Sequence, residues 1–444
     1  MIPARKYIHA AVCLLLIFFV SKWTYYTQFT NSAFTSLSLH YDDGINYDNS
    51  SIIYEDMSKD FYDITFWSEH DKQFKYTVIN YKGNLEALLP YKILSGSFPI
   101  FSKNSKIDKC VISSTLSYEK WGSLDTVGKI FIESNKNYIV AGIFDCNKKI
   151  IALLNNQTYE GVYKFIELTG YNRHDMDVLS SLRVSKNLPN YSRAVNYGLI
   201  SSVISYISCV PMILIFLTLF IKLILRNIKL KIIKSHFIVI TCWGIFITFI
   251  LLIVFNAYPL SDYFIPSKWS NFEHWDNLFR EINLQIYTII SYGGNIKSIL
   301  FQESAFYVFF YAICACTIQM SLCFLFAIRS SYEIFTKTLL SLSMTMLMFI
   351  LFENCVQAFV PNILCWIYYP TVLIMQYMIR FLTKYKVDKL LLNNNQIDSK
   401  LIKRKRQKER VRAAVGEEAP DNAVRGYRGI NLVPLRQRDD DIGY

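Results

Sequence analysis

The chain has 444 residues, of which 52% are hydrophobic, and its mean hydropathy is positive. It is too apolar for an ordinary soluble protein, and polar stretches interrupt it too often for a pure bundle of membrane helices. The formal net charge of +12 would suggest a nucleic-acid partner in a soluble protein. Here the basic residues flank apolar segments, which is the pattern of cytoplasmic loops, so no nucleic-acid partner is expected.

The first predicted element is an apolar stretch over residues 7–25, within an N-terminal membrane anchor of residues 1–28. Arg5 and Lys6 precede the stretch, and Trp23 lies near its end, where an interfacial aromatic belt is expected. A cleaved signal peptide would share the basic start and the apolar core, but no small-x-small cleavage site follows. We therefore favour an uncleaved anchor.

Residues 29–195 are polar and strand-like, and they predict an α+β domain with its own core. Apolar or β-branched runs bounded by Asn, Lys and Gly predict strands over 76–81, 109–113, 129–133 and 138–144. Helices are predicted over 116–121 and 159–170. Gly96 and Gly128 stand at expected turns, where a positive φ is tolerated.

Five further stretches of about 20 largely apolar residues follow, each long enough to cross a membrane. They cover 198–224, 237–255, 305–328, 338–360 and 363–382. Basic residues without acids fill the loop 226–234, and more basic residues mark 329–337 and the segment after 383, so these parts are predicted to be cytoplasmic. With six spans, both termini of this plasma-membrane protein are cytoplasmic and the α+β domain between the first two spans is extracytoplasmic.

The resulting division has a transmembrane hairpin over 196–256, an external aromatic-rich loop over 257–302 and a three-span region over 303–383. The external loop is expected either to lie on membrane lipid as an amphipathic helix or to pack against the α+β domain. Residues 384–444 form a basic cytoplasmic tail that is expected to be disordered, and from about Ala413 its apolar content is too low to fold alone. Its last part is either a disordered regulatory tail or an appended, non-native segment.

No catalytic, cofactor or metal site is expected, because the six histidines have no metal-ligand spacing. The segment Gly122–Ile130 has a spacing one residue too long for a phosphate loop and lacks its Ser/Thr. Glu353 and Asn354 are the clearest polar pair inside a predicted span, with either a functional role or a position close enough to the interface to reach water. Cys110 and Cys146 are the only cysteines of the α+β domain, and they either form a disulfide or stay free.

An ordered set of short motifs runs through residues 93–144. Its members are Ile93–Phe98, Cys110–Ser113, Leu116 with Trp121–Ser123, Val127–Ile130 and Tyr138–Ile143. In this order they resemble the extracytoplasmic core domain of MacB/FtsX-type ABC transporter permeases. The spacing between Gly96 and Phe98 is one residue shorter than in that family.

The resemblance implies a permease that dimerises with itself or a related subunit and recruits a separate ATPase, so ATP hydrolysis would reside in a partner. It also implies coupling to that ATPase through a short cytoplasmic helix, matched here by Arg329, Glu333, Ile334 and Lys337. The family has three spans after its external domain, whereas five are predicted here. We favour the last three spans as the family's trio, with 198–255 as an inserted hairpin; in the alternative, 198–328 holds the trio and the last hairpin is extra.

The function expected from this layout is mechanical. A separate ATPase would move the external domain, which would act on a peptide, a bacteriocin or a lipid-linked substrate at the outer surface. Two alternatives share the layout: a membrane sensor or regulator that exports nothing, and a receptor or adhesion protein unrelated to ABC transporters.

Overall fold

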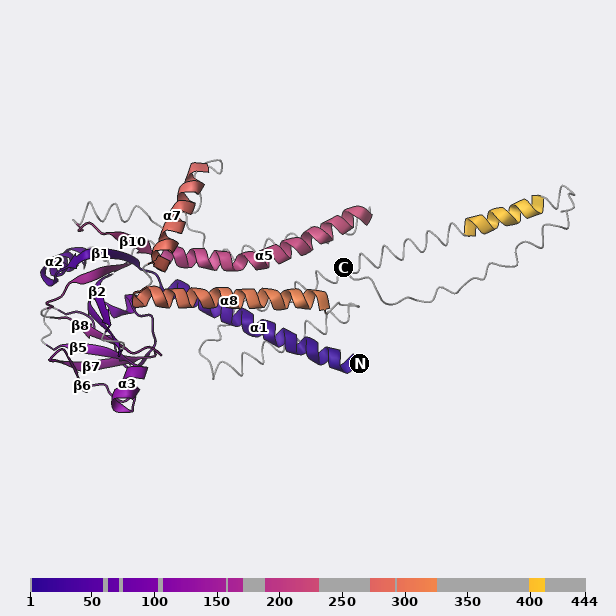
Figure 1. The fold of residues 1–444 in the computed structure, drawn as a ribbon. Coiled ribbons are helices and arrows are strands. Elements are labelled where there is room, and N and C mark those ends of the chain that lie inside the picture. The colour runs from indigo at the N-terminus through magenta and orange to yellow at the C-terminus, as the bar shows by residue number, and fades with distance from the viewer. Residues whose placement is uncertain are drawn as a thin grey trace. The chain divides into compact units, whose positions relative to one another are not determined.

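The computed structural model describes residues 2–58, 63–71, 75–102, 107–156, 159–170, 188–230, 272–291, 294–325 and 399–411. The strands are β1 Leu37–Ile45, β2 Asp63–Asp71, β3 Thr77–Lys82, β4 Ile93–Gly96, β5 Lys109–Ser113, β6 Ile130–Glu133, β7 Lys136–Phe144, β8 Ile150–Leu154, β9 Tyr163–Thr169 and β10 Arg193–Asn196. The helices are α1 Ile2–Ala33, α2 Tyr47–Ser58, α3 Ser114–Trp121, α5 Tyr197–Leu230, α7 Phe272–Ser291 and α8 Ile296–Leu325, with the short 3₁₀ helix η1 Leu85–Ala87 (Figure 1).

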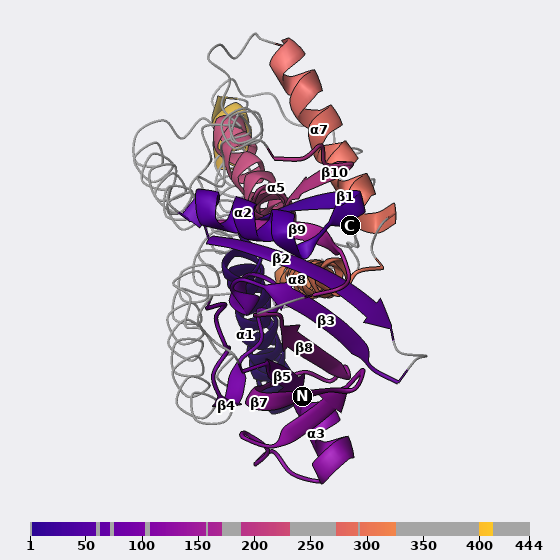
Figure 2. The same cartoon turned by 90° about the vertical axis from the view of Figure 1, so that its left-hand side faces the viewer.

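The ten strands form one mixed sheet, in the order β10-β1-β9-β2-β3-β8-β5-β7-β4, with β6 also paired to β7 (Figure 2). The pairs β3–β8 and β5–β7 are parallel, and the other neighbours are antiparallel. Parallel pairs need a crossover, and α3 with β6 provides the one between β5 and β7. The domain therefore has a mixed α+β topology.

Alternating side chains divide the core of this sheet between its two faces. Cys110 and Ile112 of β5 belong to one cluster, in which Leu116 of α3 takes part. Val111, between them in the sequence, belongs to the cluster that α1, α5 and α8 complete. The long helices therefore pack against one face of the sheet, and α3 packs against the other.

The helices α1, α5 and α8 extend away from the sheet side by side (Figures 1 and 2). Their contacts combine aromatic rings with small polar side chains, which let helices approach closely in a membrane. Tyr26 of α1 stacks on Tyr311 of α8 with ring centroids 5.4 Å apart. Trp23 Nε1 of α1 donates a hydrogen bond of 3.0 Å to Ser208 Oγ of α5.

The structure confirms the mixed α+β domain and four predicted strands, which correspond to β3, β5, β6 and β7. The positive φ angles predicted at Gly96 and Gly128 are also present, at 75° and 87°. The helix predicted over 159–170 is wrong, because Tyr163–Thr169 forms β9 between β1 and β2. Its short apolar run fits a helix or a buried strand equally well.

Among the described residues, the stretch Ile296–Ser321 of α8 is long and apolar enough to cross a membrane, and Tyr197–Pro211 of α5 is a shorter apolar stretch. The predicted spans over 237–255, 338–360 and 363–382 lie outside the described residues. Six spans therefore remain a prediction. In the separate unit Arg380–Tyr444, residues 399–411 form an exposed helix, so the tail predicted to be disordered contains at least one helical segment.

Candidate functional site

A buried ion pair lies where the long helices meet the sheet. Lys297, in the first turn of α8, places its Nζ 2.6 Å from Oε2 of Glu167 in β9. The two side chains are 1% and 0% exposed. Charges taken out of water cost several kcal/mol each unless good geometry and further hydrogen bonds compensate them. The stability of this buried pair is therefore expected to depend closely on the groups that hydrogen-bond to it.

Each polar atom of this pair has its partners. Lys297 Nζ donates to Glu167 Oε2, to Ser36 Oγ and, at 2.9 Å, to the Ala87 carbonyl of η1, which uses all three ammonium protons. Glu167 Oε2 also accepts from Ser36 Oγ at 2.7 Å, and Oε1 accepts from Trp67 Nε1 at 3.2 Å. We call Ser36, Trp67, Glu167 and Lys297 the junction cluster.

The junction cluster connects three parts of the chain that are distant in sequence. Ser36 lies between α1 and β1, Trp67 and Glu167 belong to the sheet, and Lys297 is in the first turn of α8. The start of α5 joins them, because the Tyr197 ring lies 5.0 Å from Lys297 Nζ and its hydroxyl is 2.8 Å from Ser298 Oγ of α8. The link from α1 to β1 and the starts of α5 and α8 therefore meet the sheet at one buried polar network.

The first turn of α8 has a second connection to the sheet. The Asn295 side chain accepts from the Ser298 N–H at 2.7 Å, as an N-cap residue does. Glu69 Oε2 of β2 accepts from the Ile296 N–H at 2.8 Å. Burial raises the pKa of the Glu69 carboxyl to about 7, although the bond from Ile296 opposes this shift and the Asp71 charge adds to it.

Helix α7 packs beside the same junction. Gln285 Oε1 of α7 accepts from the Asn196 N–H at 3.2 Å, and Gln302 Nε2 of α8 donates to the Ile289 carbonyl of α7 at 2.9 Å. Phe279 and Tyr287 on another side of α7 are exposed. One face of the predicted amphipathic helix therefore packs against the domain and α8, while contact of its other face with lipid remains a prediction.

Most of the residues predicted from sequence to have special roles are not among those that the structure describes. Arg329, Glu333, Ile334 and Lys337, and the pair Glu353 and Asn354, are outside the described residues. The junction cluster was not predicted. Its signal was a lone lysine at the start of an apolar stretch, which requires a buried partner when it lies inside the protein.

The possible disulfide between Cys110 and Cys146 is not formed, and both thiols are free and buried. Cys110 pairs in register with Val140 in β7, whereas Cys146 lies beyond the far end of that strand. At a rise of about 3.3 Å per residue the cysteines are roughly 15–20 Å apart, and a disulfide requires less than about 7 Å between Cα atoms. They also belong to clusters on opposite faces of the sheet.

No protein-family model matches the sequence, and no curated protein matches it. Among solved structures, the chain is similar to the periplasmic region of MacB from Actinobacillus actinomycetemcomitans, with 10% identity, a TM-score of 0.30, and coverage of 39% of this chain and 93% of that one. It is also similar to the extracellular domain of the noncanonic ABC-type transporter YknZ from Gram-positive bacteria, with 10% identity, a TM-score of 0.23, and coverage of 33% and 87%. A domain of a putative permease protein from Porphyromonas gingivalis has 12% identity, a TM-score of 0.22, and coverage of 35% and 85%. At these identities the likenesses concern fold alone, and they say nothing of a substrate or a partner.

Proposed function

We propose that this chain is the permease subunit of an ABC-type system, in which a separate ATPase moves the external sheet domain through α1, α5 and α8. The observation that carries the proposal is the junction cluster, a buried and satisfied set of polar contacts that joins the α1–β1 link and the first turn of α8 to the sheet. Tyr197, the first residue of α5, packs against Lys297 of this cluster. Such a junction suits the transmission of movement, because the helices and the sheet can shift together without exposing a charge. The motif order over residues 93–144 is the second support.

The packing of α5 bears on which spans form the family's trio. α5 follows β10 directly, contacts α1 and α8, and takes part in the polar network through Tyr197. An inserted hairpin would have no reason to share this junction. We therefore propose that 198–328 holds the trio, which is the less favoured alternative from sequence, and that the last two predicted spans are the addition.

The coupling segment follows from the same proposal. The sequence match places it at Arg329, Glu333, Ile334 and Lys337. The basic segment 226–234, which begins in the last part of α5, is the first predicted cytoplasmic connection within the proposed trio. Both segments carry the charge that suits docking on a soluble ATPase. A pair of matched variants can distinguish them.

The experiment compares two double variants in membranes that also contain the partner ATPase. Because residues 226–234 lie within the proposed trio, Arg226→Ala with Lys229→Ala is expected to uncouple ATP hydrolysis from domain function without loss of expression. Arg329→Ala with Glu333→Ala tests the segment matched from sequence and is expected to leave coupling intact. Uncoupling by Arg329→Ala with Glu333→Ala alone would move the coupling site to 329–337 and favour the last three predicted spans as the trio. Normal coupling in both variants would show that neither segment is the coupling site. If no ATPase copurifies with the chain, a receptor becomes the favoured function.

A further inference from the structure

A small cavity of about 260 Å³ lies where strands β1, β9 and β10 meet α7 and the start of α8. His40 of β1 pairs in register with Phe165 of β9 and with Arg193 of β10, and directly paired residues share one face of a sheet. Thr288 and Ile289 of α7 also line this space, which we call the α7 cavity. The α7 cavity is therefore formed by parts of the chain that are distant in sequence.

The size and the apolar lining of the α7 cavity limit its ligand. Liquid water takes roughly 30 Å³ per molecule, so the cavity has room for roughly nine non-hydrogen atoms. Phe165, Val195 and Ile289 contribute apolar surface to it. The rings of His40 and Phe165 lie 4.9 Å apart, which positions this wall before any ligand binds. The ligand is therefore small and partly apolar.

Two cationic side chains, Lys164 and Arg193, line the cavity near His40. Burial lowers the pKa of His40, and the charges of Arg193 and Lys164 lower it further, against the opposite effect of Asp42. Both cations therefore act on the His40 ring, which itself stays neutral near neutral pH. Guanidinium and ammonium groups are the strong hydrogen-bonding partners of a carboxylate. This part of the cavity therefore suits the carboxylate of a ligand.

Glu69 of β2 brings an acidic group to the same cavity. Among the described residues, no cation acts on its carboxyl: burial raises the pKa to about 7, the Ile296 N–H opposes this shift, and the Asp71 charge adds to it. The Ile296 N–H bonds to Oε2, which leaves Oε1 for a ligand. A cationic group beside Glu69 would favour the charged carboxylate. Glu69 therefore suits the ammonium group of a ligand.

The distance between the two kinds of charge suits a small zwitterion. Arg193 in β10 and Glu69 in β2 are three strands apart in the sheet, which is roughly 14 Å between backbones. Both side chains are long and both line one cavity, so their charged ends are closer together than this. An α-amino acid, in which a carboxylate and an ammonium group adjoin, fits between them.

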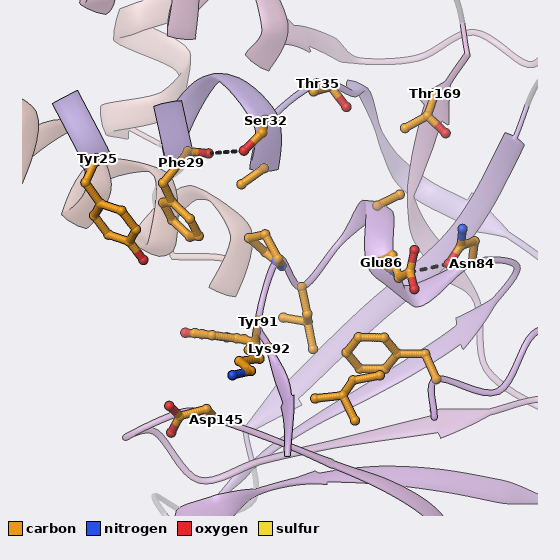
Figure 3. A pocket seen from close by; sticks show the side chains of 16 residues that line it. Tyr25, Phe29, Ser32, Thr35, Asn84, Glu86, Tyr91, Lys92, Asp145 and Thr169 are labelled. Atoms are coloured by element: carbon orange, nitrogen blue, oxygen red, sulfur yellow. Dashed lines mark hydrogen bonds between the residues drawn. The ribbon is translucent and has the colours of Figure 1, made fainter. Parts of the chain in front are cut away.

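A larger cavity of about 930 Å³ lies beside the domain end of α1 and is less suited to a charged ligand. Its charged side chains, Glu86, Lys92 and Asp145, are all exposed (Figure 3). Water weakens the attraction between such charges and a ligand. Glu69 and Arg193 of the α7 cavity are partly buried, so their charges act more strongly.

From these observations we propose that the α7 cavity binds a free α-amino acid with an apolar side chain. The ligand carboxylate binds Lys164 and Arg193, and the ammonium group binds Glu69. The apolar side chain packs on Phe165 and Ile289. Because the sheet and α7 both line the cavity, the ligand stabilises the contact between them. This inference goes beyond the proposed function and does not depend on it.

The test is calorimetric titration of the full chain in phospholipid nanodiscs. The probe is leucine, which matches the size and the apolar lining of the cavity. Two analogues each lack one charge: leucinamide has no carboxylate, and 4-methylpentanoate has no ammonium group. Leucine is expected to bind about tenfold more tightly than either analogue, because each analogue loses one charge-assisted contact.

Two variants separate the ends of the ligand. Glu69→Gln should weaken the binding of leucine about tenfold and leave that of 4-methylpentanoate unchanged. Arg193→Gln should weaken the binding of both and leave that of leucinamide unchanged. The matched controls Glu160→Gln and Arg280→Gln change exposed residues outside the cavity and should bind all three compounds as the wild type does. A merely structural effect would instead weaken all three.

The wild type by itself can overturn the proposal, even if a variant fails to fold. Absence of leucine binding would do so. Equal binding of leucine and 4-methylpentanoate would also do so, since the cavity would then be a site for anions alone. Displacement of bound leucine by inorganic phosphate would have the same meaning.

Discussion

Lys297 and Glu167 are both charged and both fully buried, so their effect on stability depends on what surrounds them. Their Coulomb attraction is offset by the cost of removing both charges from water, and the pair is therefore weak evidence of net stabilisation. Loss of one partner is different, because it leaves an unpaired charge in the junction cluster. Together the two charges matter more for the position of α8 on the sheet than for the free energy of unfolding.

The first prediction concerns this asymmetry. Lys297→Met should lower the free energy of unfolding by about 3–5 kcal/mol, since Glu167 then remains buried without its cation. The double variant Lys297→Met with Glu167→Leu should recover most of that loss. Thermal unfolding in detergent measures the single and double variants. If the loss of stability in the double variant equals the sum of two large single losses, the charges do not act as a pair.

A second prediction concerns Glu69. Burial raises the pKa of its carboxyl to about 7 from 4.5, so between these values the native state binds more protons than the unfolded state. The stability contribution of Glu69 should therefore fall as the pH rises through this window and level off above it. Thermal unfolding from about pH 5 to about pH 8 should show this decline in the wild type and a smaller one in Glu69→Gln. Equal slopes in the two proteins would contradict it.

Among the elements, the strands predicted from sequence were those whose pattern of apolar and turn residues lies within and next to the strand itself. Residues 109–113 and 138–144 carry a buried run bounded by turn residues, and this suffices to identify β5 and β7. Strand β9 was missed because its Glu167 looks like an exposed helical position in sequence, although it is buried. Its partner Lys297 is 130 residues away, and local patterns carry no information on such a contact. The junction cluster could therefore not be predicted as a site.

The edge of the sheet at β4 and β7 supplies a third prediction. A Cβ at Gly96 would lie 2.1 Å from the Ala141 carbonyl oxygen, whereas a Cβ at Gly122 would meet nothing within 4 Å, and both residues have a positive φ. Gly122→Ala should cost only the left-handed backbone strain of about 1–2 kcal/mol. Gly96→Ala should cost clearly more, because β4 must also move away from β7. Chemical unfolding of the two variants measures the difference between their losses in free energy of unfolding. Equal losses would mean that β4 can move away from β7 at no cost in stability.

For the whole molecule, the central claim is that the sheet domain and the three long helices move together. The helices that leave the sheet include α8, which contains the one described stretch long and apolar enough to cross a membrane. The layout of a leading helix, an inserted domain and later helices was predictable because hydropathy reports it directly. The grouping of α1, α5 and α8 at one junction was not, because three apolar segments can pack in several orders.

The most direct test measures movement of the domain relative to the membrane. A fluorophore at the exposed Ile132 of β6 reports its distance from quencher-labelled lipid head groups, in vesicles that hold the chain with the proposed partner ATPase. Addition of ATP should change the quenching in the wild type, and Lys297→Met should reduce that change while ATP hydrolysis continues. An unchanged ATP response in Lys297→Met, or no response in a wild-type complex that hydrolyses ATP, would contradict the claim.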